Sequence, residues 1–272
     1  MGDAYLGMRP GDLDGRPYAK YWNPEMGPMQ EHVQQALLHG AEAPELGFAA
    51  GEADRLLEPG SLPLESGFTR LPNGQVFVAV LTKMPGVTAE MIDWWFGWHY
   101  MESQRYKLWH PRAHLRNGAK RMIGDDPGLS DREKYLHNPN YVTEYVGASR
   151  LEIEITFSDA SDFFDTSRFE EAGVGTAICG TVGLQKAPVT IGQLIHLIRE
   201  TPDGCEMRSR FWLGKIALGD VPGAEPLNRL VGSRFVARRA TSLTRGRDLV
   251  VHCAMEMNHL ASFLPALHAD YH

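Results

Sequence analysis

The chain has 272 residues, of which 43% are hydrophobic and 22% are charged, and its formal net charge is −7. This composition is typical of a globular protein with enough apolar material to bury a full core. The negative charge argues against nucleic acid as the main partner, because phosphate binding needs a concentrated basic surface. The most basic run, residues 234–247, contains five arginines but is interrupted by aliphatic and hydroxyl residues. We interpret it as a solvated face in preference to a phosphate site.

The cysteines and the N-terminal sequence bear on location. Cys179, Cys205 and Cys253 show no CxxC spacing, which argues against a disulfide framework or a cysteine-rich zinc site and favours a reducing compartment. The N-terminus lacks a basic segment followed by an apolar one, and no stretch reaches the roughly 18 apolar residues that span a bilayer. We therefore expect a cytoplasmic protein with no membrane partner.

Residues 1–66 are rich in proline and glycine and contain one clear amphipathic helix, from about Met29 to Leu38. Gly40 lies where this helix would end. The segment cannot hold a core of its own, so it is expected to pack on the rest of the chain or on a second subunit. We predict a helical and irregular N-terminal region with a role in dimerisation, or as a lid, and hence a homodimer.

From residue 67 to residue 272 the pattern is more regular. A Pro-Asn-Gly turn precedes a predicted strand, Gln75–Leu81. Thr88 can cap a helix that we expect to continue to about Lys107. Residues 117–140 have the composition of a polar excursion that contains several turn-forming residues.

Two further strands are predicted after this excursion. They are Tyr141–Val146 and Leu151–Phe157, and in the second one apolar residues alternate with polar ones, as in a strand with one wet face. The runs Ile191–Arg199 and Glu206–Leu213 flank a Thr-Pro-Asp-Gly turn at 201–204, which predicts a hairpin. The sheet is therefore predicted to be antiparallel.

The last long element is a helix over about 249–264, which we expect to stop at Pro265. A strand, a helix, several antiparallel strands and a C-terminal helix together favour the α+β class, with helices gathered on one side of a curved sheet. Such a sheet can wrap around the last helix. The space between them would suit a hydrophobic ligand.

His252 and Glu256 have the i, i+4 spacing that places two side chains on one face of a helix, one turn apart, as two metal ligands require. A surface ion pair is the commoner meaning of this spacing. Here, however, the neighbours are largely aliphatic residues and methionines, among which a solvated pair would be out of place. His259 continues the same side and is a competing ligand candidate.

Four other polar residues stand in apolar or aromatic surroundings. His110 and His114 follow an aromatic-rich segment at a predicted helix end, where they either point into a site or cap backbone carbonyls. Glu144 has β-branched and aromatic neighbours, among which an unpaired charge is costly to bury and a metal would offset that cost. His196 interrupts an apolar strand, and both a functional role and a satisfied core histidine fit that position.

Four segments carry a resemblance to a known family. They are WWFGWHYMESQRYKLWHPRAH, NYVTEYVG, RETPDGCEMRSRFWLG and HCAMEMNHLASFLP. In this order they cover most of residues 67–265, and the chain resembles the diacetylphloroglucinol hydrolase and phloretin hydrolase family. The resemblance implies an enzyme that hydrolyses the carbon–carbon bond between an acyl group and a phloroglucinol-type ring. It also implies a helix-grip fold, similar to START and pollen-allergen domains, for residues 67–272.

The family resemblance further implies a zinc ion and a set of residues that bind it. By motif position, the ligands are His114, Glu144, His252 and Glu256. This set contains the helical pair that the spacing alone had suggested. The resemblance also implies that the N-terminal part takes part in dimerisation.

Substrate-contacting residues are implied in the same way. Tyr106, Asn117 and His196 resemble the polar groups that line the family's pocket. His196 is the candidate for proton transfer or for hydrogen bonding to the acyl carbonyl, and the other two for holding ring hydroxyls or the carbonyl. The family has a tyrosine where this chain has Phe211, so one hydroxyl donor is missing and substrate preference is expected to differ.

Two other function classes stay open. The first is a non-catalytic carrier of hydrophobic aromatic ligands, which would need no metal. The second is a non-haem iron oxygenase with two histidines and one carboxylate. Other common classes are disfavoured, because the chain has no GxSxG, GxGxxG, GxxxxGK[ST] or HExxH motif.

Overall fold

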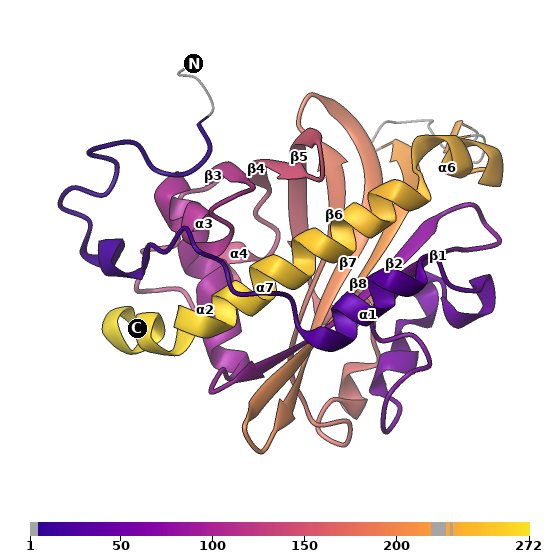
Figure 1. Cartoon of the computed structure of the whole chain (residues 1–272), viewed down its shortest axis with the longest axis horizontal. Coiled ribbons are helices and arrows are strands. Elements are labelled where there is room, and N and C mark those ends of the chain that lie inside the picture. Colours follow the sequence, from indigo (N-terminus) through magenta and orange to yellow (C-terminus); the bar gives the residue numbers. More distant parts are fainter. Residues whose placement is uncertain (1–4, 219–226, 229–230) are drawn as a thin grey trace.

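The computed structural model describes residues 5–218, 227–228 and 231–272 of the chain. Its centre is an eight-stranded antiparallel sheet with the order β1-β2-β8-β7-β6-β5-β4-β3 (Figure 1). The strands are β1 Gly67–Arg70, β2 Val76–Pro85, β3 His114–Ala119, β4 Asn140–Val146, β5 Ser149–Ser158, β6 Val174–Leu184, β7 Ala187–Thr201 and β8 Gly204–Leu218.

Helices and single turns connect and cover these strands. The α-helices are α1 Glu31–His39, α2 Ala89–Trp98, α3 Ser103–Trp109, α4 Asp131–Tyr135, α6 Arg234–Ala240 and α7 Leu243–Tyr271. The 3-10 helices are Pro17–Tyr21, Pro44–Leu46, Ala50–Leu57, His99–Met101, Ala160–Asp162 and Thr166–Arg168. Among the described residues, none of these helices has the length and apolar character needed to cross a membrane.

The long helix α7, yellow in Figure 1, runs across one face of the sheet, where it packs against β1 and β2. Val76, Val78 and Val80 of β2 lie in the core beneath this helix. Phe77 and Ala79, which alternate with them, lie in a second core on the opposite face. The predicted α+β class and the antiparallel sheet are confirmed.

The N-terminal region packs on both of these cores. Tyr18 and Val33 are buried in the core beneath α7, whereas Phe48 and Leu56 belong to the core on the other face. The indole Nε1 of Trp212 donates a 2.6 Å hydrogen bond to the carbonyl oxygen of Phe48. Of the two placements expected for this region, packing on the rest of its own chain is therefore confirmed.

The helix predicted over 88–107 is wrong in its extent, because the structure has two helices there, α2 and α3. Thr88 caps α2 as expected. Glu102, between the helices, has extended backbone angles (φ −145°, ψ 137°). Its carboxylate accepts a 2.6 Å hydrogen bond from the Tyr18 hydroxyl and pairs with Arg16 at 2.7 Å. These partners are distant in the sequence, so the local pattern does not show the break.

The helix predicted to stop at Pro265 is also wrong in its extent, because α7 begins earlier and continues beyond this proline. A proline removes one intrahelical hydrogen bond. On either side of it, however, Leu264 and Leu267 are fully buried, and the Tyr21 hydroxyl donates a 2.8 Å hydrogen bond to the carbonyl of Ala266. Tertiary packing thus holds the last turns in helical form.

The polar excursion predicted over 117–140 contains regular structure. It includes the second half of β3, which pairs with β4, and the short helix α4. Tyr135 of α4 is fully buried, and its hydroxyl donates to Asp93 at 2.5 Å. Strand β6 was not predicted, whereas the hairpin of β7 and β8 around residues 201–204 is confirmed.

Candidate metal centre

Helix α7 places His252 and Glu256 one turn apart, as their spacing predicted. Their exposed fractions are 6% and 7%. Nε2 of His252 lies 3.6 Å from Oε2 of Glu256. Because both side chains are buried, a solvated surface ion pair is excluded.

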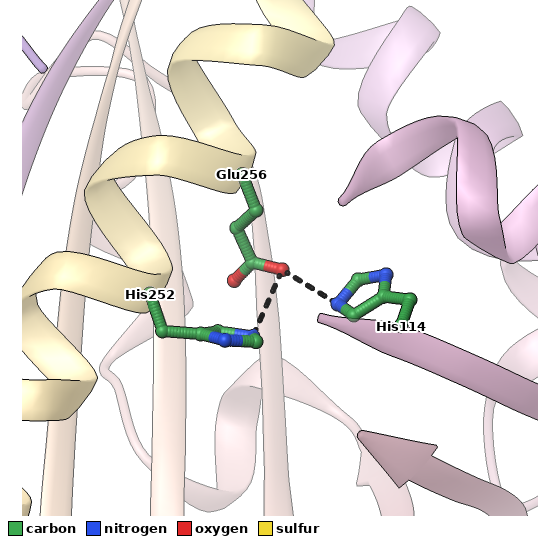
Figure 2. Close-up of side chains that lie close together, drawn as sticks. All are labelled: His114, His252 and Glu256. Atoms are coloured by element: carbon green, nitrogen blue, oxygen red, sulfur yellow. Dashed lines mark ion pairs between the residues drawn. The ribbon is translucent and has the colours of Figure 1, made fainter. Parts of the chain in front are cut away.

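Strands β3 and β4 bring His114 and Glu144 to this pair. The two residues are direct partners in the ladder, so their side chains lie on the same face of the sheet. Nε2 of His114 is 3.4 Å from Oε2 of Glu256 and 3.7 Å from Oε2 of Glu144. The Glu144 oxygen is 3.9 Å from Nε2 of His252. Figure 2 shows the side chain of His114 directed from its strand toward His252 and Glu256 on α7.

The geometry of this group fits a metal ion. One ligand atom each from His114, His252 and Glu256 lies within 4.8 Å of the others. Within the part of the chain that the structure describes, Nε2 of His114 is buried without a hydrogen-bond partner. A tetrahedral zinc site with bonds of about 2.0–2.1 Å has edges of roughly 3.3–3.4 Å. The observed nitrogen–oxygen distances of 3.4 to 3.9 Å are only slightly longer.

The electrostatics of the group favour a cation as well. Burial, and then the neighbouring Glu144, raises the pKa of Glu256 well above its ordinary value. Burial holds the pKa of His114 well below its usual range, with His252 and His110 adding to the effect. Burial lowers the pKa of His252 too. The imidazoles are therefore neutral, as metal ligation requires, and a divalent cation would relieve the repulsion between the two buried carboxylates.

Tyr106 contacts two of these residues in three ways. Its hydroxyl donates a short hydrogen bond to Oε2 of Glu144. Its ring stacks on the imidazole of His114, with centroids 3.7 Å apart and planes 5° from parallel. Its carbonyl oxygen lies 2.9 Å from Nδ1 of His114, and since a carbonyl only accepts, Nδ1 carries the proton and Nε2 presents its lone pair to the group. The implied pocket residue Tyr106 therefore also holds the candidate ligands in position.

A cavity of about 470 Å³ opens beside this group, between the sheet and α7. Hydrophobic and aromatic side chains form most of its wall. Among its lining residues are Tyr106, Glu144, His252, Glu256, His196 and Phe211. The predicted space for a hydrophobic ligand is therefore present, and it is in contact with the candidate metal ligands.

His196 lies on the cavity wall contributed by β7. Its Nδ1 is 2.7 Å from the hydroxyl oxygen of Ser209, and burial lowers its pKa to about 3. Phe211 contacts it edge-on, with ring centroids 5.6 Å apart. Asn117 pairs with Val142, a cavity residue, and so shares its face of the sheet. Asn117 itself is not among the lining residues, and its Nδ2 is buried without a partner among the described residues.

Two further histidines that the sequence singled out, His110 and His259, lie outside the group. His110 stacks on the ring of His252, with centroids 4.8 Å apart. His259, the competing candidate on α7, is buried but does not belong to the group of atoms that could hold a metal ion.

Two residues with a place in the site were not singled out by the sequence. Ser209 is the direct ladder partner of His196, and counting outward from the predicted turn at 201–204 would have found it. His99 lines the cavity beside Tyr106. It lies within the aromatic-rich segment, where nothing in the local pattern separates it from core residues.

Comparison with known proteins supplies relatives for this chain. A 2,4-diacetylphloroglucinol hydrolase of Pseudomonas protegens is 35% identical over 264 residues, which cover 94% of this chain and 85% of the relative. A protein of the same name from a Pseudomonas species is 34% identical, with 94% and 88% covered. A phloretin hydrolase of Eubacterium ramulus is 28% identical, with 93% and 89% covered.

The model of one protein family matches residues 48–269, which is most of the chain. This match includes the second core, the whole sheet and nearly all of α7. It agrees with the resemblance carried by the four sequence segments, and the named relatives are hydrolases. The chain belongs to the DAPG hydrolase PhiG domain family.

Proposed function

We propose that this protein hydrolyses the carbon–carbon bond between an acyl group and a phloroglucinol-type ring. The observation that carries the proposal is the buried group of His114, His252 and Glu256 beside an apolar cavity, in a chain of the DAPG hydrolase family. An acylated polyphenol has a flat, largely apolar body with hydroxyl groups at its edge. An apolar cavity with few polar groups suits such a ligand.

We infer that the cofactor is Zn²⁺, held by His114, Glu144, His252 and Glu256. Imidazole and carboxylate donors at near-tetrahedral spacing favour zinc among the common divalent metals. When bound, zinc would supply Lewis acidity and make water more acidic at neutral pH. Tyr106 keeps two of these side chains in place through its stack on His114 and its hydrogen bond to Glu144.

The proposed reaction balances with water as the only co-substrate. The water oxygen bonds to the acyl carbon, the bond from that carbon to the ring breaks, and its electron pair stays on the ring carbon. That carbon takes up a proton, so the products are a carboxylic acid and the deacylated phenol. The hydroxyl groups make the ring electron-rich, which favours the uptake of a proton at that carbon.

His196 is our candidate for moving this proton or for hydrogen bonding to the acyl carbonyl. It lies on the cavity wall and stays neutral, since burial lowers its pKa to about 3. Tyr106 and Asn117 are the candidates for holding the ring hydroxyls or the carbonyl. For Asn117 this role would use its Nδ2 donor, on the face of β3 that it shares with the cavity residue Val142.

The test combines metal analysis with an ultraviolet assay of acylphloroglucinol cleavage, with and without a chelator. We expect about one zinc ion per chain and cleavage that the chelator abolishes. His252→Ala and Glu256→Ala should lose metal and turnover together. His259→Ala, on the same helix but outside the group, should retain both. A metal-free variant that still cleaves the substrate would contradict the proposal.

We further infer that the sheet and α7 form a helix-grip domain and that residues 1–66 contribute to a homodimer in the cytoplasm. The basis for the helix grip is the long helix that lies across a single antiparallel sheet (Figure 1). The dimer is tested by light scattering of the purified protein. A mass of one chain at micromolar concentration would contradict it.

A further inference from the structure

His99 forms part of the cavity wall close to the candidate metal centre. It caps the C-terminal end of α2 and is 4% exposed. Its imidazole stacks on Trp95, with centroids 5.3 Å apart and planes 15° from parallel. The ring of Tyr106, which contacts both His114 and Glu144, lies 6.0 Å away. His99 is therefore held rigidly beside the site while remaining outside the group of candidate ligands.

The hydrogen bond at Nδ1 of His99 fixes the position of its proton. Nδ1 lies 2.8 Å from the carbonyl oxygen of Trp95. Because a carbonyl oxygen can only accept, Nδ1 must carry the hydrogen. Burial lowers the pKa of His99 to about 4, so the ring is neutral at physiological pH and Nε2 has no hydrogen. Nε2 is therefore purely an acceptor.

This acceptor has no partner within the described part of the chain. Two other polar groups of the wall have partners, since the Tyr106 hydroxyl donates to Glu144 and Nδ1 of His196 contacts Ser209. Among the described residues, Nε1 of Trp109, also on this wall, is buried without a partner, but it is a donor and cannot accept a hydrogen bond from a hydroxyl group. The ring of Phe96 lies close to both histidines, with centroids 5.6 Å from His99 and 6.1 Å from His196. A fixed acceptor in such apolar surroundings lacks a donor that a ligand could provide.

We propose that Nε2 of His99 accepts a hydrogen bond from a free hydroxyl group on the aromatic ring of the substrate, so that His99 selects hydroxylated rings. This inference rests on the proposed function and names one determinant of its substrate class. A methyl ether has no hydrogen to donate, and a ring without the hydroxyl leaves the acceptor unpaired. Both are expected to bind and react poorly, because a site built to pair a hydroxyl discriminates strongly against analogues that lack it.

The hydroxyl para to the acyl group is the natural partner. Hydroxyls ortho to the acyl group can donate to its carbonyl oxygen within the substrate itself. The para hydroxyl has no such internal acceptor. The acceptor for this hydroxyl must therefore be a protein group or a water molecule, and a ligand that fills an apolar cavity displaces water from it.

The experiment compares acetylphloroglucinol with the analogue that lacks the para hydroxyl, using kcat/KM for each substrate. The wild type should prefer acetylphloroglucinol by roughly 10-fold or more beyond the preference shown by a His99 variant. His99→Phe keeps an aromatic ring that can stack on Trp95 but removes the acceptor. It should lose activity mainly toward acetylphloroglucinol, so that its preference falls. The two substrates differ in intrinsic reactivity, but this difference contributes equally to the ratio of kcat/KM values in every variant. It therefore cancels when the ratios of two variants are compared.

Two further variants make the outcome decisive. His99→Leu is measured in parallel, so that the comparison does not depend on the folding of one variant, and zinc content is measured for each. His39→Phe, at an exposed position on α1, is the matched control and should keep the wild-type preference. A His99 variant that retains zinc and the full wild-type preference would overturn the inference while leaving the proposed function intact. If the wild type cleaves neither substrate, both this inference and the proposed function are overturned.

Discussion

Glu65 is the residue whose replacement should destabilise the fold most clearly without touching the site. Its carboxylate accepts hydrogen bonds from Arg208 at 2.5 Å and from Arg210 at 2.6 Å. The two arginine side chains are 1% and 0% exposed, and that of Glu65 is 13% exposed. Removing one partner of a buried ion pair costs about 3–5 kcal/mol, because the remaining charge stays desolvated. Since Glu65 keeps some contact with solvent, we expect about 3 kcal/mol for Glu65→Gln.

Urea unfolding followed by circular dichroism measures this loss. Glu58→Gln is the matched control, because Glu58 pairs with Arg168 at 2.7 Å on the surface, where its side chain is 58% exposed. That variant should leave the free energy of unfolding nearly unchanged. If Glu65→Gln proves as stable as Glu58→Gln, the two buried guanidinium groups need no counter-charge and the expected loss of stability is wrong.

The ion pairs of Glu65 with Arg208 and Arg210 also predict that stability depends on pH. Burial alone would raise the pKa of Glu65, but Arg210 and Arg208 outweigh it and hold the pKa below its ordinary value of 4.5. A carboxylate with a depressed pKa contributes stability above its unfolded pKa and loses it as the pH falls through the folded one. The stability difference between wild type and Glu65→Gln should therefore be constant near neutral pH and shrink below about pH 4.5. A difference that grows on acidification would contradict this assignment.

Two more predictions concern side chains that position the site. Tyr106→Phe removes the hydroxyl that binds Glu144 but keeps the stack on His114, so zinc affinity should fall by about 10–100-fold without unfolding. Competition with a coloured chelator measures it, and an unchanged affinity would rule out this role of the hydroxyl. Ser209→Ala removes the partner of Nδ1 of His196 and should lower kcat by roughly 10-fold with zinc content unchanged. Ser209→Thr should restore most of kcat, and a kcat that neither variant changes would refute the positioning role.

The sequence predicted those parts of the fold that local patterns determine. Alternation along Leu151–Phe157 and the turn at 201–204 were sufficient for β5 and for the hairpin of β7 and β8. The errors lie where distant residues decide the conformation. The predicted helix is interrupted at Glu102, whose carboxylate binds Tyr18 and Arg16. These two residues lie some eighty residues earlier in the chain. No window of local sequence contains such partners.

The residues of the candidate site also divide into those that local spacing predicts and those that depend on distant parts of the chain. His252 and Glu256 were found from the residues alone, because one turn of helix fixes their relation. His114 and Glu144 depend on the pairing of β3 with β4, and the second half of β3 was predicted to be part of a polar excursion. Their surroundings in the sequence marked both as candidates, but only the resemblance to a family joined them to the helical pair. It also supplied Tyr106, which the local pattern could not distinguish from a core tyrosine.

The pairing of His114 with Glu144 depends in turn on a single irregularity of the ladder. From Arg116 onward, β3 pairs regularly with β4, with Arg116 opposite Thr143. Continued without interruption, that register would set His114 opposite Tyr145, and its imidazole would lie on the face of the sheet away from the cavity. The register shift between His114 and Arg116 places His114 opposite Glu144 instead. One extra residue at the end of an edge strand therefore turns the imidazole toward α7, as β-bulges next to active sites commonly do.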